Sequence, residues 1–319
     1  SPSPSRASAV DAARGISARQ GMRGPTFVAA DERVQEAVRF VEAAVRARTP
    51  ILIVGETGTG KELLARHAHA ASDRPGDFVA LNCAAIPAEL FEAELFGYVG
   101  GSFSGARREG SAGLIASAHR GTLLFDEIRE LPVALQAALL RFLDDGCIRA
   151  VGATTMRQVD VQILAATNVE PADDQAAGRL RGDLLYRLDA VRVVLPPLRQ
   201  RRDFAAAARA TLQAIDGNAT LTDDALAHLA RAAWPGNFRQ LRAVLTRALM
   251  LHPGGPITHD DVAPLVTAAP KASTSALQRD ATETVCNEFE RTGRSVSRTS
   301  RNLGISRTTV YRHLRAAGR

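Results

Sequence analysis

The sequence predicts an α/β protein in which a parallel β-sheet lies between helices, with a basic helical domain at the C-terminal end. Three observations support this class. The apolar run ILIV at 51–54 leads through a glycine-rich turn into an amphipathic helix that begins at Lys61. Two further apolar runs, at 122–125 and 161–168, also end in polar residues. Because the carboxyl ends of parallel strands meet at one edge of a sheet, these runs predict a ligand site at that edge.

Length and composition are those of an ordinary folded protein. The 319 residues suffice for two domains, or for three if one is small. No apolar run approaches the ~18 residues of a membrane span, and no charged-then-apolar leader opens the chain, so no membrane association is expected. Cys83, Cys147 and Cys286 lie far apart and match no metal or redox spacing, which favours a cytoplasmic location with reduced thiols.

The net charge of +6 is concentrated near the C-terminal end. Residues 271–319 contain 10 basic and 4 acidic side chains, whereas the preceding 270 residues contain 30 of each. A neutral body with a basic end is typical of a nucleic-acid-binding module joined to another domain. The alternative is a solvated, disordered tail.

A phosphate-binding loop follows the first predicted strand. Gly55, Gly60 and Lys61 fit the pattern Gly-x-x-x-x-Gly-Lys between a strand and a helix. Glycines let backbone N–H groups wrap around phosphates, and the start of the next helix adds its positive dipole end. Glu62 stands where the general pattern has a Ser or Thr that ligates Mg²⁺. We expect the loop to bind ATP through Gly55, Glu56, Thr57, Gly58, Thr59, Gly60, Lys61 and Glu62.

Two carboxylates end the strand within GTLLFDEI. Such a placement is costly unless the carboxylates bind a cation or hydrogen-bond a ligand. We expect Asp126 to hold Mg²⁺, directly or through a water molecule, and Glu127 to polarise the attacking water as general base. Asn168, at the end of the third strand, would sense the terminal phosphate. The alternative is a coincidence of three polar strand ends.

Eight motifs extend this pattern along the chain: GETGTGKE (55–62), LNCAAI (81–86), ELFGY (94–98), GTLLFDEI (121–128), AATN (165–168), LLYRL (184–188), LPPLRQRRDF (195–204) and WPGNFRQL (234–241). With them the chain resembles the AAA+ ATPases, and more narrowly the bacterial enhancer-binding proteins that activate sigma-54 RNA polymerase. The resemblance implies an AAA+ P-loop fold with a helical lid subdomain. In this family a Glu is usual at the position of Glu62, so the missing Ser or Thr does not argue against ATP binding.

The resemblance implies further roles for individual residues. Asn82 would be the switch that holds Glu127 and reports the state of the nucleotide. Arg181 and Arg187 would be arginine fingers offered to the ATP of a neighbouring subunit, which implies a homo-oligomer, from a dimer to a hexameric ring. Arg239 would reach from the lid to the phosphates of its own subunit. The alternatives are a strand-end cap for Asn82 and ordinary surface arginines for the two fingers.

The glycine-rich stretch 96–110 predicts neither helix nor strand. By itself it would be interpreted as a surface loop in which Phe103 packs against nearby residues. The family carries here a loop that reads Gly-Ala-Phe-Thr-Gly-Ala. The resemblance therefore implies that sigma-54 is contacted by Gly101, Ser102, Phe103, Ser104, Gly105 and Ala106. Ser104 keeps the hydroxyl of the usual Thr but lacks its β-branch, so its side chain rotates more freely.

The segment 295–318 has the pattern of a helix-turn-helix. Gly304 permits the turn, Ser306 caps the second helix, and Val310 and Leu314 would face inward at i and i+4. The segment resembles the Fis-type domain that ends many enhancer-binding proteins, which implies double-stranded DNA as a partner. The face disposed toward a major groove carries Arg307, Thr309, Arg312 and His313.

These observations predict a sigma-54-dependent transcriptional activator that hydrolyses ATP in an oligomeric ring and binds upstream DNA. The alternative is a DNA-binding repressor that keeps the ATPase fold without contacting sigma-54. A chaperone-like or helicase AAA+ machine would explain neither the Phe103 loop nor the basic end. The expected parts are a flexible lead-in (1–26), a nucleotide-binding α/β subdomain (27–198), a lid (199–266), a linker (267–276) and a Fis-type DNA-binding domain (277–319).

Overall fold

The computed structural model describes residues 30–102, 108–252 and 254–266, and near the C-terminus residues 285, 288–289, 291–292, 295–303, 309–310 and 314. The chain divides into two compact units, Ser1–Leu265 and Val266–Arg319. Each unit has a hydrophobic core of its own.

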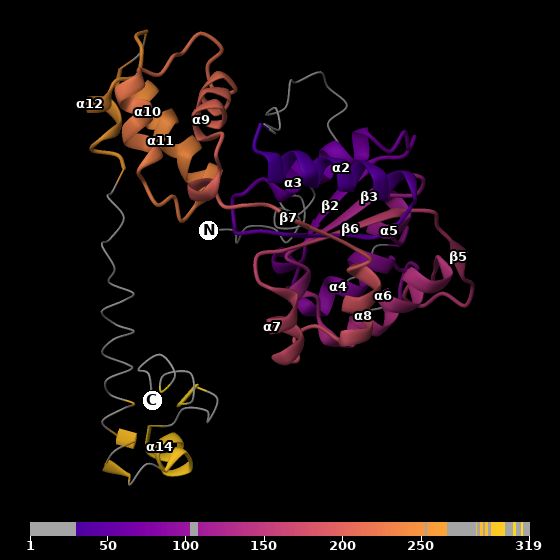
Figure 1. Ribbon diagram of the computed structural model, residues 1–319. Helices are drawn as coiled ribbons and strands as arrows, with labels where there is room; N and C mark the ends of the chain where they lie inside the picture. The colour runs from indigo at the N-terminus through magenta and orange to yellow at the C-terminus, as the bar shows by residue number, and fades with distance from the viewer. Residues whose placement is uncertain are drawn as a thin grey trace, which may run out of the picture. The chain divides into compact units, whose positions relative to one another are not determined.

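A five-stranded sheet with the order β2-β3-β6-β1-β7 forms the centre of the first unit (Figure 1). Every neighbouring pair of strands is parallel, as the sequence predicts. Strand β1 lies between β6 and β7, so the loop that follows it leaves the sheet from an interior position. The strands are β1 (Ile51–Val54), β2 (Phe78–Asn82), β3 (Thr122–Asp126), β6 (Gln162–Thr167) and β7 (Val191–Val194).

The register brings the predicted site residues to one edge of the sheet. Asn82 at the end of β2 pairs with Asp126 at the end of β3. Val54 at the end of β1 pairs with Thr167 at the end of β6. The phosphate loop, the two carboxylates and Asn168 therefore all follow strands that end at the same edge.

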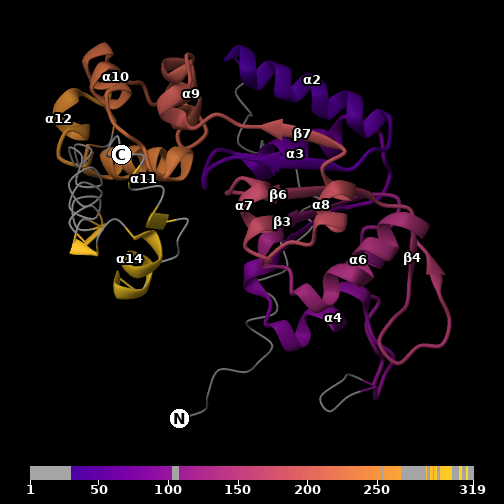
Figure 2. The same cartoon turned by 60° about the horizontal axis from the view of Figure 1, so that its bottom comes forward.

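Helices cover both faces of the sheet, as Figures 1 and 2 show. Successive strand residues point to opposite faces, so Ile51 and Ile53 pack with Val41 and Leu64, whereas Leu52 packs on the other side with the residues of a second core. One face carries α2 (Glu32–Arg46) and α3 (Lys61–Ala70). The other carries α4 (Ala88–Phe96), α6 (Val133–Asp145) and α8 (Gly182–Leu188).

Short elements complete the α/β part. The antiparallel pair β4 and β5 follows α6, and η3 leads from the sheet toward the lid. Their bounds are η1 (Cys83–Ala85), α5 (Leu114–Ser117), η2 (Ile128–Glu130), β4 (Cys147–Ile148), β5 (Arg157–Gln158), α7 (Pro171–Ala176) and η3 (Leu198–Gln200).

Within its described residues, the expected helical lid has four helices, α9 (Phe204–Gln213), α10 (Asp223–Ala230), α11 (Asn237–Leu251) and α12 (His259–Val262). Trp234, on the loop before α11, is 1% exposed and anchors this subdomain. Its ring stacks on Phe204 with 6.3 Å between centroids, and its Nε1 donates to the carbonyl of Leu229 at 2.8 Å. The loop that begins α11 is thereby fixed from inside the lid.

The second unit contains α14 (Val296–Leu303) and a small apolar cluster. Val310 and Leu314 are buried, as expected from their spacing, together with Val285. Gly304 and Ser306, expected in the turn and the cap, lie outside the described residues. Across the described parts of the chain, no helix combines the length and the apolar character that crossing a bilayer requires.

Candidate nucleotide site

The phosphate loop curls over the N-terminus of α3. Gly58 and Gly60 have φ angles of +80° and +101°, which side chains with a Cβ rarely adopt. The Thr59 hydroxyl donates to the carbonyl of Glu56 at 2.8 Å and closes the loop on itself. Gly60 is the N-cap of α3, and no side chain caps the helix there. The first N–H groups of the helix are therefore available to an anion.

Lys61 supplies a positive charge inside this loop. It is 7% exposed, and its Nζ donates to the carbonyls of Gly55 at 2.8 Å and Glu56 at 3.4 Å. Burial lowers its pKa, while the carboxylates of Asp126 and Glu127 oppose that effect. In the part of the chain that the structure describes, no carboxylate pairs with the ammonium within 4 Å. A buried cation without an ion-pair partner suits a phosphate ligand.

The two carboxylates stand at the end of β3. Asp126 accepts a hydrogen bond from the N–H of Glu127 at 3.1 Å. Glu127 has a left-handed backbone, with φ 53° and ψ 51°, which is uncommon for a residue other than glycine. Burial raises the pKa of both groups, and the charge of Lys61 opposes the rise. Backbone strain of this kind is often found at functional sites.

Two asparagines lie close to this strand end. The Oδ1 of Asn82 accepts from the N–H of Ala84 at 2.9 Å, so the side chain caps the turn η1. Among the described residues, no hydrogen bond joins it to Glu127. Asn168 donates through Nδ2 to the hydroxyl of Thr57 at 3.3 Å, while its Oδ1 is buried without a described partner. Asn168 thus connects the end of β6 to the phosphate loop.

A cavity of about 290 Å³ lies between the phosphate loop and the lid. Lys61, Asp126 and Glu127 line one wall, and Arg239 and Arg242 of α11 line another. The structure therefore brings the expected lid arginine to the cavity. It adds Arg242, which sequence reasoning missed although it lies on the same face of the helix at i+3.

Some predicted ATP-binding residues do not line this cavity. The loop residues from Thr57 to Glu62 do so, but Gly55, Glu56 and Asn168 do not. Asn82, predicted as the catalytic switch, does not line it either. Gly55 and Glu56 contribute backbone carbonyls to Lys61 instead.

The predicted fingers lie at the two ends of α8, and neither lines the cavity of this chain. Arg181 pairs with Asp183 at 2.7 Å, and these hydrogen bonds hold the pKa of Asp183 at about 2. Arg187 lies 3.3 Å from Asp144 and donates to the carbonyl of Leu143 at 3.1 Å. Both arginine side chains are about half exposed, at 47% and 50%. They are therefore accessible to a second copy of the chain.

Two predicted contact sites lie mostly outside the described residues. Gly101 and Ser102 are exposed, and Thr309 is half-buried. The structure does not describe the remaining members of the sigma-54 and DNA sets, which are Phe103, Ser104, Gly105, Ala106, Arg307, Arg312 and His313.

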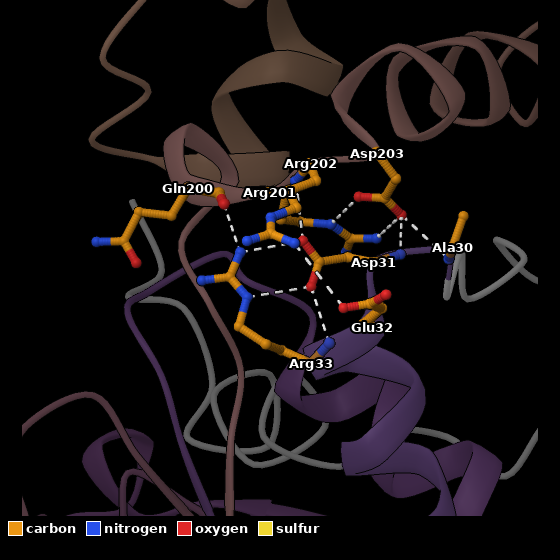
Figure 3. A network of polar contacts seen from close by, with 8 residues as sticks. All are labelled: Ala30, Asp31, Glu32, Arg33, Gln200, Arg201, Arg202 and Asp203. Carbon is orange, nitrogen blue, oxygen red and sulfur yellow. Dashed lines mark hydrogen bonds and ion pairs between the residues drawn. The ribbon is translucent and has the colours of Figure 1, made fainter.

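A polar network joins the start of α2 to the entrance of the lid (Figure 3). Asp31 caps α2 and pairs with Arg33 at 3.0 Å, and these hydrogen bonds hold the pKa of Asp31 well below its usual range. Asp203 accepts from the N–H groups of Ala30 and Asp31 and pairs with Arg201 at 2.6 Å. Burial alone would raise the pKa of Asp203, but the bonds from Arg201 lower it.

This network also reaches the cavity. Arg201 lines the cavity, and its guanidinium lies 5.2 Å from the ring centroid of Phe238, another lining residue. The sequence predicted no individual role for Arg201 or Asp203, which lie within the motif LPPLRQRRDF. The run of arginines in LPPLRQRRDF did not reveal that Arg201 is the buried one. The neighbouring Arg202 donates its backbone N–H to Asp31, 171 residues away in the sequence, so a distant segment packs beside this run.

Comparison with known proteins agrees with this geometry. Residues 27–194 match the family described as the sigma-54 interaction domain, and residues 202–279 match the AAA+ ATPase lid domain. Regulatory protein LuxO of Vibrio cholerae is 36% identical over 312 residues, covering 90% of this chain and 68% of its own. The acetoin catabolism regulatory protein of Cupriavidus necator is 39% identical over 308 residues, covering 90% of this chain and 45% of its own.

Solved structures give the same result. A crystal structure of NtrX from Brucella abortus in complex with ATP has a TM-score of 0.66 and 32% sequence identity, covering 93% of this chain and 70% of that one. RuvB of Thermotoga maritima, at 14% identity and a TM-score of 0.51, shares the fold alone.

The parallel sheet, the phosphate loop with the carboxylate pair, and the helical lid define an AAA+ ATPase. Within that class, the chain belongs to the sigma-54-dependent transcriptional activators, the bacterial enhancer-binding proteins.

Proposed function

We propose that this chain hydrolyses ATP in a homo-oligomeric ring, in the bacterial cytoplasm, and uses the energy to remodel the closed promoter complex of sigma-54 RNA polymerase. The observation that carries the proposal is the convergence of Lys61, Asp126, Glu127 and Arg239 on one cavity, in a chain of this family. A cation from the loop, two strand-end carboxylates and a lid cation are the groups that nucleotide hydrolysis requires.

In this mechanism the phosphate loop from Thr57 to Glu62 binds the phosphates through its N–H groups and the Lys61 ammonium. Glu127 orients a water molecule for in-line attack on the terminal phosphate and accepts its proton. Asn168 lies beside the loop, where its amide can sense that phosphate. Arg239 stabilises charge that develops on the phosphoryl oxygens.

Mg²⁺ fits this donor set. The described residues contain no group of three or more His, Cys, Asp or Glu that would hold a metal on their own. Mg²⁺ in nucleotide sites is commonly held by one or two carboxylates together with phosphate oxygens and water. Asp126, half-buried at the strand end without an ion-pair partner among the described residues, would hold it, directly or through water. The ion would neutralise phosphate charge during transfer.

Assembly would complete the site. Arg181 and Arg187 stand away from the cavity of their own chain on an exposed face, so they would act on the nucleotide of a neighbouring copy. Asn82 caps the turn η1 through its bond with the N–H of Ala84. We propose that it exchanges this bond for one with Glu127 as the nucleotide state changes.

The sigma-54 contact would be made by the loop Gly101–Ala106 with Phe103 at its centre. A ring would raise several such loops from one face, and each phenylalanine could bury ~150–250 Å² against a partner. DNA binding would come from residues 277–319, whose second helix carries Arg307, Thr309, Arg312 and His313. The buried positions of Val310 and Leu314 support a folded domain there.

Transcription from a sigma-54 promoter in vitro tests this function. Wild-type protein should open the promoter with ATP, whereas Phe103→Ala should hydrolyse ATP, assemble and bind its operator without opening the promoter. The same variant should not capture sigma-54 in the presence of ADP with a metal fluoride, which stands in for the transferring phosphoryl group. Normal promoter opening by Phe103→Ala would overturn the role of the loop. Wild-type protein that binds DNA and hydrolyses ATP but never opens the promoter would point to a repressor.

A further inference from the structure

Glu56 belongs to the phosphate loop, but its carboxylate faces the lid. The Arg199 guanidinium donates to both of its oxygens, at 2.6 and 2.7 Å. The Nδ2 of Asn237 donates to one of them at 3.2 Å. The bonds from Arg199 hold the pKa of Glu56 below its usual range. This side chain is therefore engaged by protein groups and does not line the nucleotide cavity.

Asn237 is the second member of the same cluster. It is fully buried and has a φ of +48°, a conformation that Asn adopts more easily than most residues. Its Nδ2 also donates to the carbonyl of Thr57 at 3.0 Å, and its Oδ1 accepts from the N–H of Leu198 at 2.7 Å. One amide therefore ties the phosphate loop to the turn η3 and to the first residue of α11.

The backbones of the loop and the lid are also in direct contact. The N–H of Phe238 donates to the carbonyl of Gly58 at 2.9 Å. A Cβ placed on Gly58 would lie 2.4 Å from the carbonyl oxygen of Gly236, closer than non-bonded atoms allow. The lid loop is therefore seated on the phosphate loop and leaves no room between the two backbones.

We propose that Glu56, Arg199 and Asn237 form a lid latch that positions Arg239 against the phosphate site. Arg239 follows Asn237 by two residues on α11, so fixing Asn237 sets where the helix begins and which wall of the cavity Arg239 reaches. The latch members are positioning residues, because none of them lines the cavity. The inference rests on the proposed role of Arg239 in hydrolysis.

The same contacts connect the latch to the nucleotide. Asn237 and Phe238 bind the carbonyls of Thr57 and Gly58, and the peptide units that carry these carbonyls belong to the loop that wraps the phosphates. Hydrogen bonds in series strengthen one another. A change in the loop on phosphate binding or release therefore reaches the first turn of α11 through two hydrogen bonds.

A double-mutant cycle on the rate of ATP hydrolysis tests the latch. Arg199→Gln removes the guanidinium, and Glu56→Gln keeps the shape of the side chain while removing its charge. Because the pair is about 40% exposed on each side, we expect each single variant to lower kcat by about threefold to fivefold. In the background of Arg239→Ala, neither substitution should lower kcat further, because the residue that the latch positions is gone.

Arg192→Gln is the matched control. Arg192, on the edge strand β7, is 38% exposed and pairs with Asp189 and, at 2.6 Å, with Glu170. It resembles Arg199 in exposure and in forming ion pairs, but its partners belong neither to the phosphate loop nor to the lid. Its kcat should equal that of the wild type. Arg199→Lys, which keeps the charge, should recover part of the loss. Thermal unfolding of each variant verifies that the fold is retained.

Each outcome bears on the inference. If Arg199→Gln and Glu56→Gln match the control, the latch does not position the lid. If they slow hydrolysis by the same factor with and without Arg239, they act independently of Arg239 and the positioning is wrong, although the role of Arg239 stands. If Arg239→Ala alone hydrolyses ATP at the wild-type rate, the role assigned to Arg239 fails and the latch proposal fails with it.

Discussion

Replacing Glu127 with glutamine separates ATP binding from ATP hydrolysis. Glu127→Gln keeps the size of the side chain and its capacity to hydrogen-bond but cannot accept a proton from the attacking water. A general base contributes about 10²–10⁴-fold to such a reaction, which corresponds to about 3–5 kcal/mol in the barrier. We expect a loss of kcat in that range.

Binding should respond in the opposite sense. Lys61, Asp126 and Glu127 share one wall of the cavity, and Glu127 is one of the two carboxylates that act on the Lys61 ammonium. Removing that negative charge leaves the phosphate site more positive, so ATP should bind at least as tightly as it does to the wild type. A tight but unproductive complex is the expected phenotype.

Two measurements check this prediction, steady-state phosphate release for kcat and equilibrium titration with labelled ATP for affinity. Glu130→Gln is a suitable control, because Glu130 lies on the same turn, η2, and does not line the cavity. The reasoning is refuted if Glu127→Gln releases phosphate within threefold of the wild-type rate. Loss of ATP binding in that variant would also refute it, because the carboxylate would then be needed for binding.

Three further predictions concern assembly, the loop and stability. Mixing Lys61→Ala chains with Arg187→Ala chains should restore part of the ATPase activity that each variant lacks alone, because a mixed interface can combine an intact phosphate loop with an intact arginine finger. If assembly is verified and no mixing ratio restores activity, Arg187 does not act on the nucleotide of a neighbouring subunit. Gly58→Ala should reduce ATPase activity at least tenfold, because the added Cβ would lie 2.4 Å from the lid backbone. Gly178→Ala should retain activity, because Gly178 has a similar φ of +69° but open space around the position of its Cβ. Equal ATPase rates for the two variants would contradict the close packing of the phosphate loop against the lid. Asp31→Asn should lower the free energy of unfolding by about 1–2 kcal/mol at neutral pH. Since folding depresses the pKa of Asp31, the difference in stability between Asp31→Asn and the wild type should narrow below about pH 4. A difference in thermal melts that does not change with pH would disprove this.

Local sequence patterns correctly predicted the parallel sheet and the edge at which its polar strand ends meet. The strand at 51–54 and the helix start at Lys61 lie where the apolar run and the glycine spacing place them, and β3 extends one residue further, to Asp126. Such features depend on residues that are neighbours in sequence, so periodicity and turn chemistry reveal them.

Contacts between distant segments were not predictable in the same way. Glu56 was expected to bind ATP because it sits inside a phosphate-binding motif, yet its carboxylate bonds to Arg199 and Asn237, which lie 143 and 181 residues further along. Nothing in the local pattern distinguishes a loop side chain that faces the ligand from one that faces the lid. That choice is made by tertiary packing, which the spacing of residues along a single sequence does not reveal.

The surroundings of the two predicted fingers bear on how an assembled ring would engage them. Arg181 and Arg187 each pair with a carboxylate of their own chain, and both pairs are about half exposed. Exposed ion pairs contribute little, because water screens the charges and two long side chains must be ordered. A guanidinium that reaches a phosphate in a closed, water-poor interface gains shorter and stronger hydrogen bonds. The contacts to Asp183 and Asp144 therefore hold the arginines in place, and they would not prevent transfer to the nucleotide of a neighbouring subunit in an assembled ring. If the two arginines act as fingers in a ring, we therefore expect formation of the interface, and not release of the arginines, to limit hydrolysis at low protein concentration.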